Sequence, residues 1–197
     1  AARHAGTVLR GNVRRAGIRQ HRTRSARACR KGESAARTQD TLFPSYREHA
    51  VTRIRGVDPL DIIKVMRGTS HGGWDPTDPK NGNTRIYTLV LASQTLHAAG
   101  YAMGLAFDGK TGSGDVVRDE AVVVYYGDGA SSQGDVHEAM VFAASYDAPV
   151  VFFLQNNHWA ISVPVQTQSK VPLVGRGAGY GIPSVRVDGN DVIASYA

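Results

Sequence analysis

Two short apolar runs with a helical segment between them constrain the fold of this chain more than any other feature. The runs cover residues 121–126 and 149–154, are rich in Val and Phe, and do not alternate with polar residues. Strands of a parallel sheet that is covered on both faces have this pattern. The segment between them, which reaches Tyr146, supplies the helical crossover of a right-handed βαβ unit. The sequence therefore predicts an α/β fold, with a mostly parallel sheet and helices on both faces.

Glycines and polar residues follow both predicted strands, at the edge where open α/β sheets bind ligands. Gly127 allows a sharp turn after the first strand, and Gly129 allows the backbone to approach a ligand closely. A helix that begins within residues 131–135 offers free N–H groups and a positive dipole end to a phosphate. Asp128 and Asn157 offer the oxygen ligands that Mg²⁺ prefers. We therefore expect a magnesium and diphosphate site at this edge.

These motifs also carry a family resemblance, although each alone is typical of an ordinary turn or loop. Gly127-Asp128-Gly129 followed by Asn156-Asn157 is similar to the signature of thiamin diphosphate enzymes. Residues 126–135 and 152–162 resemble the alpha subunit of the decarboxylating component of 2-oxo acid dehydrogenases, and the likeness runs from about Phe43 to Ala197. The resemblance implies the thiamin diphosphate-binding fold, with thiamin diphosphate and Mg²⁺ as cofactors. It also implies oxidative decarboxylation of a 2-oxo acid and transfer of the acyl group to a lipoyl group.

The resemblance assigns roles to individual residues and implies no catalytic side chain within this chain. Arg47 suits a diphosphate because its guanidinium group can grip phosphate oxygens with two hydrogen bonds. The implied cofactor-binding residues are Tyr46, Arg47, Leu89, Leu91, Gly127, Asp128, Gly129, Ala130, Gln155 and Asn157, and the implied metal ligands are Asp128, Asn157 and the backbone oxygen of Trp159. Some family members bind a monovalent ion at the positions of Thr88, Val90, Ser93 and Gln94. The sequence Leu89-Val90-Leu91 departs from the more polar family version of that site.

The resemblance also implies partners. A beta subunit supplies the glutamate that activates the cofactor, in an assembly of two alpha and two beta subunits, and a lipoyl acyltransferase takes the acyl group. The small residues of the segment 92–107, including Gly100 and Gly104, suggest a docking face for the beta subunit. A branched-chain 2-oxo acid is the favoured substrate and pyruvate the alternative. A catalytically incomplete cofactor-binding fragment is the rival interpretation. We expect no nucleic-acid or membrane partner.

The first forty residues differ from the rest in charge, with eleven Lys and Arg against two acids, compared with twelve against fifteen in the remainder. The segment shows no helical or strand period, and it is interpreted as an organelle-targeting segment, a nucleic-acid arm, a disordered tail or sequence foreign to the family. Disorder or foreign sequence is favoured, so deleting residues 1–38 should leave the melting temperature nearly unchanged. Residues 41–197 would form the cofactor-binding domain, truncated at its carboxyl terminus. The single cysteine, Cys29, suits a reducing compartment, the cytoplasm or alternatively the mitochondrial matrix.

The remaining elements follow from local signals. Ser45 and Glu48 form a capping box at a helix start. A second helix is capped by Asp58 and closed by Gly68, and its apolar residues are expected in the core. Those core residues are Leu60, Ile63 and Met66. A strand is expected over 85–91, a helix over 92–107, a strand over 184–187 and a short helix after Asp191, while residues 69–83, with His71, form a loop.

Overall fold

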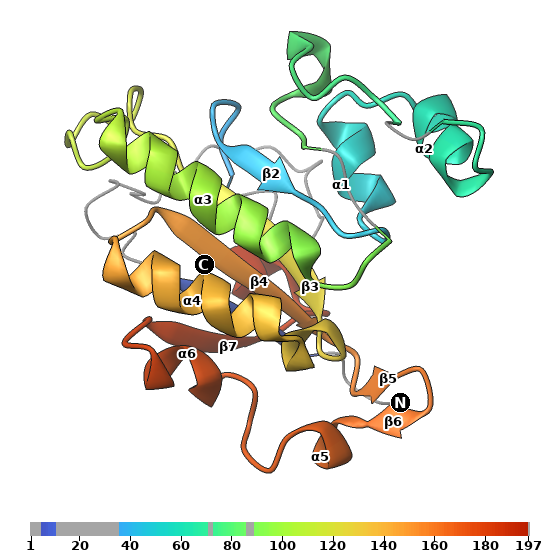
Figure 1. Ribbon diagram of the computed structural model, residues 1–197, viewed down its shortest axis with the longest axis vertical. Coiled ribbons are helices and arrows are strands. Elements are labelled where there is room, and N and C mark those ends of the chain that lie inside the picture. Colours follow the sequence, from blue (N-terminus) through green and yellow to red (C-terminus); the bar gives the residue numbers. More distant parts are fainter. Residues whose placement is uncertain (1–4, 11–35, 71–72, 86–88, 197) are drawn as a thin grey trace.

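A five-stranded sheet forms the centre of the computed structural model, which describes residues 5–10, 36–70, 73–85 and 89–196. Its order is β2-β3-β4-β1-β7 (Figure 1). The strands are β2 Thr41–Phe43, β3 Val122–Gly127, β4 Val150–Asn156, β1 Ala5–Arg10 and β7 Ser184–Asp188. Strands β2, β3 and β4 are parallel, whereas β1 is antiparallel to both of its neighbours, β4 and β7. The α/β class and the mostly parallel sheet are confirmed.

Two long helices, α3 Ser93–Phe107 and α4 Gly134–Ser145, lie side by side across one face of the sheet (Figure 1). Alternate residues of β3, such as Val124, join the core under these helices. The intervening residues, such as Tyr125, join a second cluster that includes Val51 of α1, His49–Ile54. Because β3 is buried on both faces, its sequence shows no alternation between apolar and polar residues.

The βαβ unit sets the position of the functional residues. Strand β3 leads through a 3-10 turn, η3 Ala130–Ser132, and α4 to the parallel strand β4. Gly127 pairs with Gln155, so the carboxyl ends of the two strands lie next to each other. The chain then forms a hairpin from β5 Trp159–Ala160 and β6 Val163–Pro164, which is followed by α5 Val165–Gln168, α6 Gly175–Gly179 and, after β7, α7 Val192–Tyr196.

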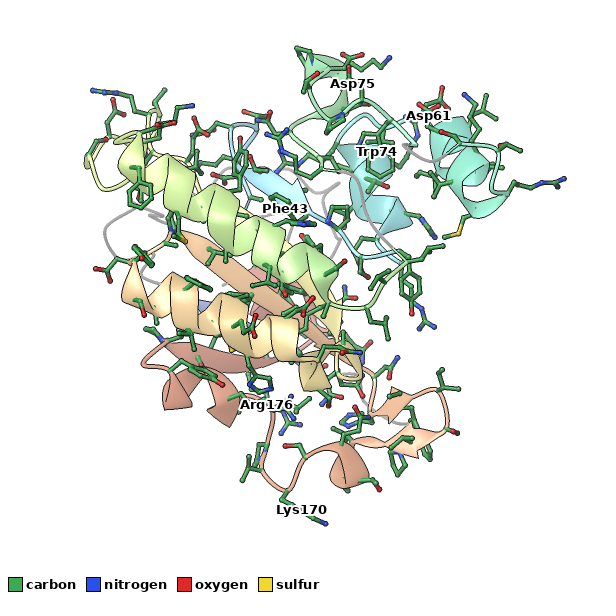
Figure 2. All side chains as sticks on the ribbon, in the orientation of Figure 1. Phe43, Asp61, Trp74, Asp75, Lys170 and Arg176 are labelled. Atoms are coloured by element: carbon green, nitrogen blue, oxygen red, sulfur yellow. The ribbon has the colours of Figure 1, made fainter. Side chains whose placement is uncertain are left out.

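A smaller lobe of α1, α2 Pro59–Met66 and the 3-10 turn η2 Pro79–Asn81 lies beside β2 (Figure 1). Trp74 lies within this lobe (Figure 2) and is buried with Val57 and Ile62. Its indole Nε1 donates a hydrogen bond of 2.8 Å to the backbone oxygen of Thr84. This bond ties the lobe to the chain next to β2, since Thr84 forms a bridge with Leu42.

The structure corrects two local expectations in this part of the chain. Leu60, Ile63 and Met66 are exposed, and Ile62 is the buried residue of α2, so their assignment to the core is wrong. The predicted cap is also wrong, because α1 begins after Glu48 and not after Ser45. The carboxylate of Glu48 nevertheless accepts a hydrogen bond of 2.7 Å from the Ser45 N–H, which is half of the expected capping box.

The strand expected over 85–91 is wrong at its end, because residues 89–92 form bends and turns, while 86–88 lie outside the described residues. His71 also lies outside them. The helix over 92–107, the strand over 184–187 and the helix after Asp191 are confirmed as α3, β7 and α7. Asp191 caps α7, since its Oδ1 accepts hydrogen bonds from the N–H groups of Ile193 and Ala194.

The amino terminus holds the largest correction. The first forty residues were expected to contain no strand, yet residues 5–10 form β1 between β4 and β7. The register places Val8 opposite Phe153 on one side and Val185 on the other. Removing β1 would leave a gap with unpaired edges on both neighbours, so the expectation that this segment contributes nothing to stability does not follow from the structure.

Val8→Pro should destabilise the protein, because proline removes an N–H from the middle of a strand that is paired on both sides. A loss of about 2 kcal/mol would lower the melting temperature by roughly 4–8 °C in a chain of this size. Thermal unfolding followed by circular dichroism measures the change. Val8→Ala keeps the N–H and serves as the control; equal melting temperatures for the two variants would show that β1 does not stabilise the sheet.

Candidate functional site

A cavity of about 650 Å³ opens at the carboxyl ends of β3 and β4. Its walls come from the segment before α1, from the turn before α3, from the turn after β3 and from the β5–β6 hairpin. Most of the site residues expected from the sequence line it: Tyr46, Arg47, Leu91, Gly127, Asp128, Gly129, Ala130, Gln155, Asn157 and Trp159. Leu89 does not line the cavity and is exposed. The structure therefore gathers residues separated by more than a hundred positions around one cavity.

The turn after β3 uses its backbone differently from the sequence expectation. The N–H groups of Ser131, Ser132 and Gln133 donate to the carbonyl oxygens three residues earlier, so they are engaged within the turn. Helix α4 begins at Gly134, within the predicted range 131–135, so this prediction is confirmed. In the part of the chain that the structure describes, no hydrogen bond occupies the N–H groups of Gly129 and Ala130, both of which line the cavity. The N–H groups of the turn that are available to a ligand in the cavity are therefore those of Gly129 and Ala130.

Gly129 lies in close contact with the hairpin. A Cβ atom at this position would come within 2.7 Å of the Cβ of Ala160, closer than real Cβ atoms approach. The close approach brings the β5–β6 hairpin against the turn and narrows the cavity between them. Glycine is required here by packing, since the φ angle of −61° is open to any residue.

Asp128 is buried, with 2% of its surface exposed. Among the described residues its carboxylate accepts a hydrogen bond of 3.1 Å from Gln168 Nε2 and forms no ion pair with Lys, Arg or His. A buried carboxylate without a cationic partner is costly, so the surroundings of Asp128 fit a bound cation. The described residues contain no cluster of three His, Cys, Asp or Glu, so such a cation would take much of its coordination from a ligand and water, as Mg²⁺ commonly does.

Asn157 and Trp159 lie in the turn between β4 and the hairpin. The Oδ1 atom of Asn157 accepts a hydrogen bond of 2.9 Å from the N–H of Trp159, and the Oδ1 of Asn156 accepts one of 2.8 Å from the N–H of His158. These bonds hold the turn, in which His158 has a φ angle of 70°. An oxygen has two lone-pair directions, so Asn157 Oδ1 retains a capacity for a cation.

Arg47 is exposed at the opposite wall of the cavity, where its guanidinium carbon lies 5.5 Å from the centroid of the Tyr46 ring. The ring supports the long side chain through a cation–π contact. A guanidinium group in this position can meet an anionic group on a ligand that reaches from the Gly127–Ala130 turn across the cavity.

Two further buried polar residues line the cavity, and sequence reasoning missed one of them, Glu48, as a site residue. Glu48 is buried and lines the cavity. Gln94 is also buried and donates 2.8 Å from Nε2 to the Tyr125 carbonyl, while its Oε1 has no hydrogen-bond partner among the described residues. Thr88, expected beside Gln94 in an ion site, lies outside the described residues. The family resemblance placed Gln94 in an ion site, whereas sequence reasoning assigned Glu48 only a capping role, and no local pattern marked Glu48 as a residue of the cavity.

Arg176 of α6 reaches back to the turn after β3 (Figure 2). Its Nη1 donates to the backbone oxygen of Ser131 and, over 2.8 Å, to the Ser131 Oγ. The Ser131 hydroxyl in turn donates to the backbone oxygen of Asp128. Burial raises the pKa of the nearby Tyr126 hydroxyl, and the positive charge of Arg176 opposes part of that rise. Arg176 therefore holds the turn from a segment to which the sequence analysis assigned no role.

The mouth of the cavity is flanked by exposed apolar side chains on two sides. Leu89, Val90 and Leu91 precede α3, whereas Trp159 and Ile161 belong to the hairpin region, and Ile161 is 100% exposed. We call these five residues the apolar rim. Four of them, all except Leu89, line the cavity itself.

No helix of the described residues is long and apolar enough to cross a membrane.

The family model described as the dehydrogenase E1 component matches residues 13–197. The chain is 43% identical, over 88% of its length and 45% of the relative's, to the 3-methyl-2-oxobutanoate dehydrogenase subunit alpha of Mycobacterium tuberculosis. The mitochondrial 2-oxoisovalerate dehydrogenase subunit alpha 2 of Arabidopsis thaliana is 36% identical, over 83% of this chain and 34% of that protein. The pyruvate dehydrogenase E1 component subunit alpha of Bacillus subtilis is 34% identical, over 83% of this chain and 41% of that protein.

Two facts follow from these matches. The chain spans less than half the length of these relatives. The family match begins at residue 13, so the expectation that the likeness starts near Phe43 is wrong.

Gly129→Ala should lower the free energy of unfolding by about 1–3 kcal/mol, because the new methyl group overlaps the Cβ of Ala160. Adding Ala160→Gly to the same variant should recover most of this loss, as expected for two residues in direct contact. Gly134→Ala is the matched control, because a Cβ there meets nothing within 4 Å. Chemical denaturation measures all four proteins. A Gly129→Ala variant as stable as the control would contradict the close packing of turn and hairpin.

Proposed function

This chain belongs to the dehydrogenase E1 component family, and we propose that it is the cofactor-binding part of the alpha subunit of a thiamin diphosphate-dependent 2-oxo acid dehydrogenase. The fold would be the thiamin diphosphate-binding fold, with residues 41–197 as the cofactor-binding domain and β1 adding one strand to its sheet. The observation that carries the proposal is the buried carboxylate of Asp128 at the carboxyl ends of two parallel strands, which forms no ion pair with any residue that the structure describes. It lies in a turn whose neighbouring N–H groups suit a diphosphate.

In this proposal, some of the residues around the cavity bind the Mg²⁺ and the diphosphate, and others contact the remainder of the cofactor. Asp128, Asn157 and the backbone oxygen of Trp159 would hold Mg²⁺. The N–H groups of Gly129 and Ala130, together with Arg47, would hold the diphosphate. Tyr46, Leu91 and Gln155 complete the wall against the cofactor, and Gly127 allows the turn. Leu89 does not line the cavity, so its expected backbone contact with the cofactor is not part of this proposal.

Thiamin diphosphate, when bound, supplies the electron sink for loss of carbon dioxide from a 2-oxo acid. The side chains of this chain bind and orient. Arg47 and the Asp128 cation site would fix one end of the cofactor, beside the close contact of Gly129 with Ala160. The chain would leave proton transfer to a carboxylate from another subunit.

A branched-chain 2-oxo acid is the substrate class that we favour. The identity to the 3-methyl-2-oxobutanoate dehydrogenase subunit of Mycobacterium tuberculosis is 43%, whereas the identity to the pyruvate enzyme of Bacillus subtilis is 34%. Pyruvate is the alternative. The acyl group would pass to a lipoyl group on an acyltransferase. The higher identity to the mycobacterial relative than to the mitochondrial one of Arabidopsis favours the cytoplasm.

A beta subunit is the partner that we propose, and the apolar rim is its docking surface. Exposed Val90, Leu91, Trp159 and Ile161 surround the open side of the cavity, so a partner that buries them would also close the site. The face of α3 is a weaker choice than the sequence suggested, because Ala98, Ala99 and Ala102 are buried within this chain. Gly100 lies outward, with nothing near its position.

Asp128→Asn should abolish Mg²⁺-dependent binding of thiamin diphosphate, because the amide keeps the shape of the side chain but removes the negative charge. Calorimetric titration of the 197-residue chain, with and without Mg²⁺, measures the effect. Asp135→Asn is the matched control, since Asp135 lies in the first turn of α4 and outside the cavity. Equal affinity of the Asp128→Asn variant and the unmodified chain would refute the metal assignment.

The chain alone should release no carbon dioxide from 3-methyl-2-oxobutanoate or pyruvate when thiamin diphosphate and Mg²⁺ are present, and a beta subunit should restore release. Glu120 lies before β3, at the far end of the sheet from the site, and Glu138 lies within α4 and outside the cavity. Glu48 lines the cavity, but its carboxylate already accepts the hydrogen bond from Ser45. Turnover by the chain alone would overturn the shared site. If Glu48→Gln then removed that turnover, Glu48 would be the acid of a self-sufficient site.

A further inference from the structure

Gln168, the last residue of α5, connects three parts of the site. Its Nε2 lies 3.1 Å from Asp128 Oδ2 and 3.1 Å from the backbone oxygen of Val163. Residue 168 is 40 positions from Asp128 in the sequence and does not line the cavity. The side chain therefore reaches the Asp128 carboxylate from behind the cavity wall.

The chemistry of the two contacts fixes the orientation of the Gln168 amide. A carboxylate and a backbone carbonyl are both acceptors, so the NH₂ group must face them and the carbonyl Oε1 must point away. That Oε1 atom is buried and has no hydrogen-bond partner in the part of the chain that the structure describes.

We propose that Gln168 is a positioning residue for the divalent cation at Asp128. The amide NH₂ holds Oδ2 of the carboxylate and thereby fixes its rotation, which leaves Oδ1 to bind the cation. The same NH₂ group holds the Val163 carbonyl, so the rotation of the carboxylate is tied to the hairpin that carries Trp159. This inference rests on the proposed function, because it assumes a cation at Asp128.

Gln168→Met tests the inference, since methionine has nearly the same length and cannot donate a hydrogen bond. Loss of a partner that orients a metal-binding carboxylate weakens metal affinity by about 10–100-fold. We expect a Kd for Mn²⁺ raised by that factor, measured from the free-ion electron paramagnetic resonance signal with thiamin diphosphate present. Gln166→Met is the matched control, because Gln166 belongs to the same short helix and is exposed. Its Mn²⁺ affinity should equal that of the unmodified chain.

A second variant separates positioning from a general effect on the hairpin. Val163→Gly loosens the hairpin and leaves the Gln168 side chain intact. The melting temperature without metal and the change in tryptophan emission report the state of the hairpin in every variant, because the other tryptophan, Trp74, is buried in the smaller lobe. A fall in Mn²⁺ affinity for Gln168→Met that exceeds the fall for Val163→Gly supports positioning. Equal falls for the two variants would mean a structural role and overturn the inference.

The outcome for Asp128→Asn keeps the inference distinct from the proposed function. If Asp128→Asn loses Mn²⁺ and Gln168→Met binds it like the unmodified chain, the metal site stands and the role of Gln168 is refuted. If Asp128→Asn also binds Mn²⁺ normally, the proposed metal site itself fails and the inference falls with it.

Discussion

The parallel pairing of β3 with β4 is the contact on which the rest of the structure depends. Both strands are buried on both faces, by α3 and α4 on one side and by the cluster around Val51 on the other. Their register places Gly127 beside Gln155, so two chain segments leave the sheet at the same edge. Polar groups that are 29 positions apart, such as Asp128 and Asn157, thereby reach one cavity.

The turn after β3 is supported from outside its own sequence. Ala160 of the hairpin packs so closely against Gly129 that there is no room for a Cβ atom at position 129. Arg176 of α6 donates a hydrogen bond to the backbone oxygen of Ser131. Gln168 holds the side chain of Asp128 from α5. Each contact comes from a part of the chain between β4 and β7, so this connection serves as the support of the site. Because the Asp128 carboxylate is buried, specific partners have to fix its orientation and compensate its charge.

The cavity is lined by buried polar residues such as Asp128 and by exposed side chains of the apolar rim. The side chains of the apolar rim, all of which except Leu89 line the cavity, are left exposed to solvent by the residues that the structure describes. This arrangement agrees with a site that is shared between subunits. The exposed apolar face of α2, with Leu60, Ile63 and Met66, is a separate patch in the smaller lobe, and it lines no part of the cavity.

The sequence by itself determined the elements whose signals are local. The buried strands β3 and β4, the crossover helix α4 and the cap at Asp58 follow from apolar runs, helical spacing and side-chain chemistry within a few residues. The glycines around Asp128 and the asparagines after β4 predicted a ligand site, because parallel strands must end at one edge. Local signals do not tell which face of a helix is buried, and this is why Leu60, Ile63 and Met66 were assigned wrongly.

Only the tertiary structure decided the contacts between distant segments. The strand β1 has no strand period in its sequence, and its place between β4 and β7 depends on backbone pairing with both neighbours. Glu48, Gln168 and Arg176 reach the site from loops and short helices, where no local pattern distinguishes a supporting residue from a solvated one. Hydrogen bonds between segments depend on where the folded backbone brings the donors and acceptors, and that placement is set by the packing of the whole domain.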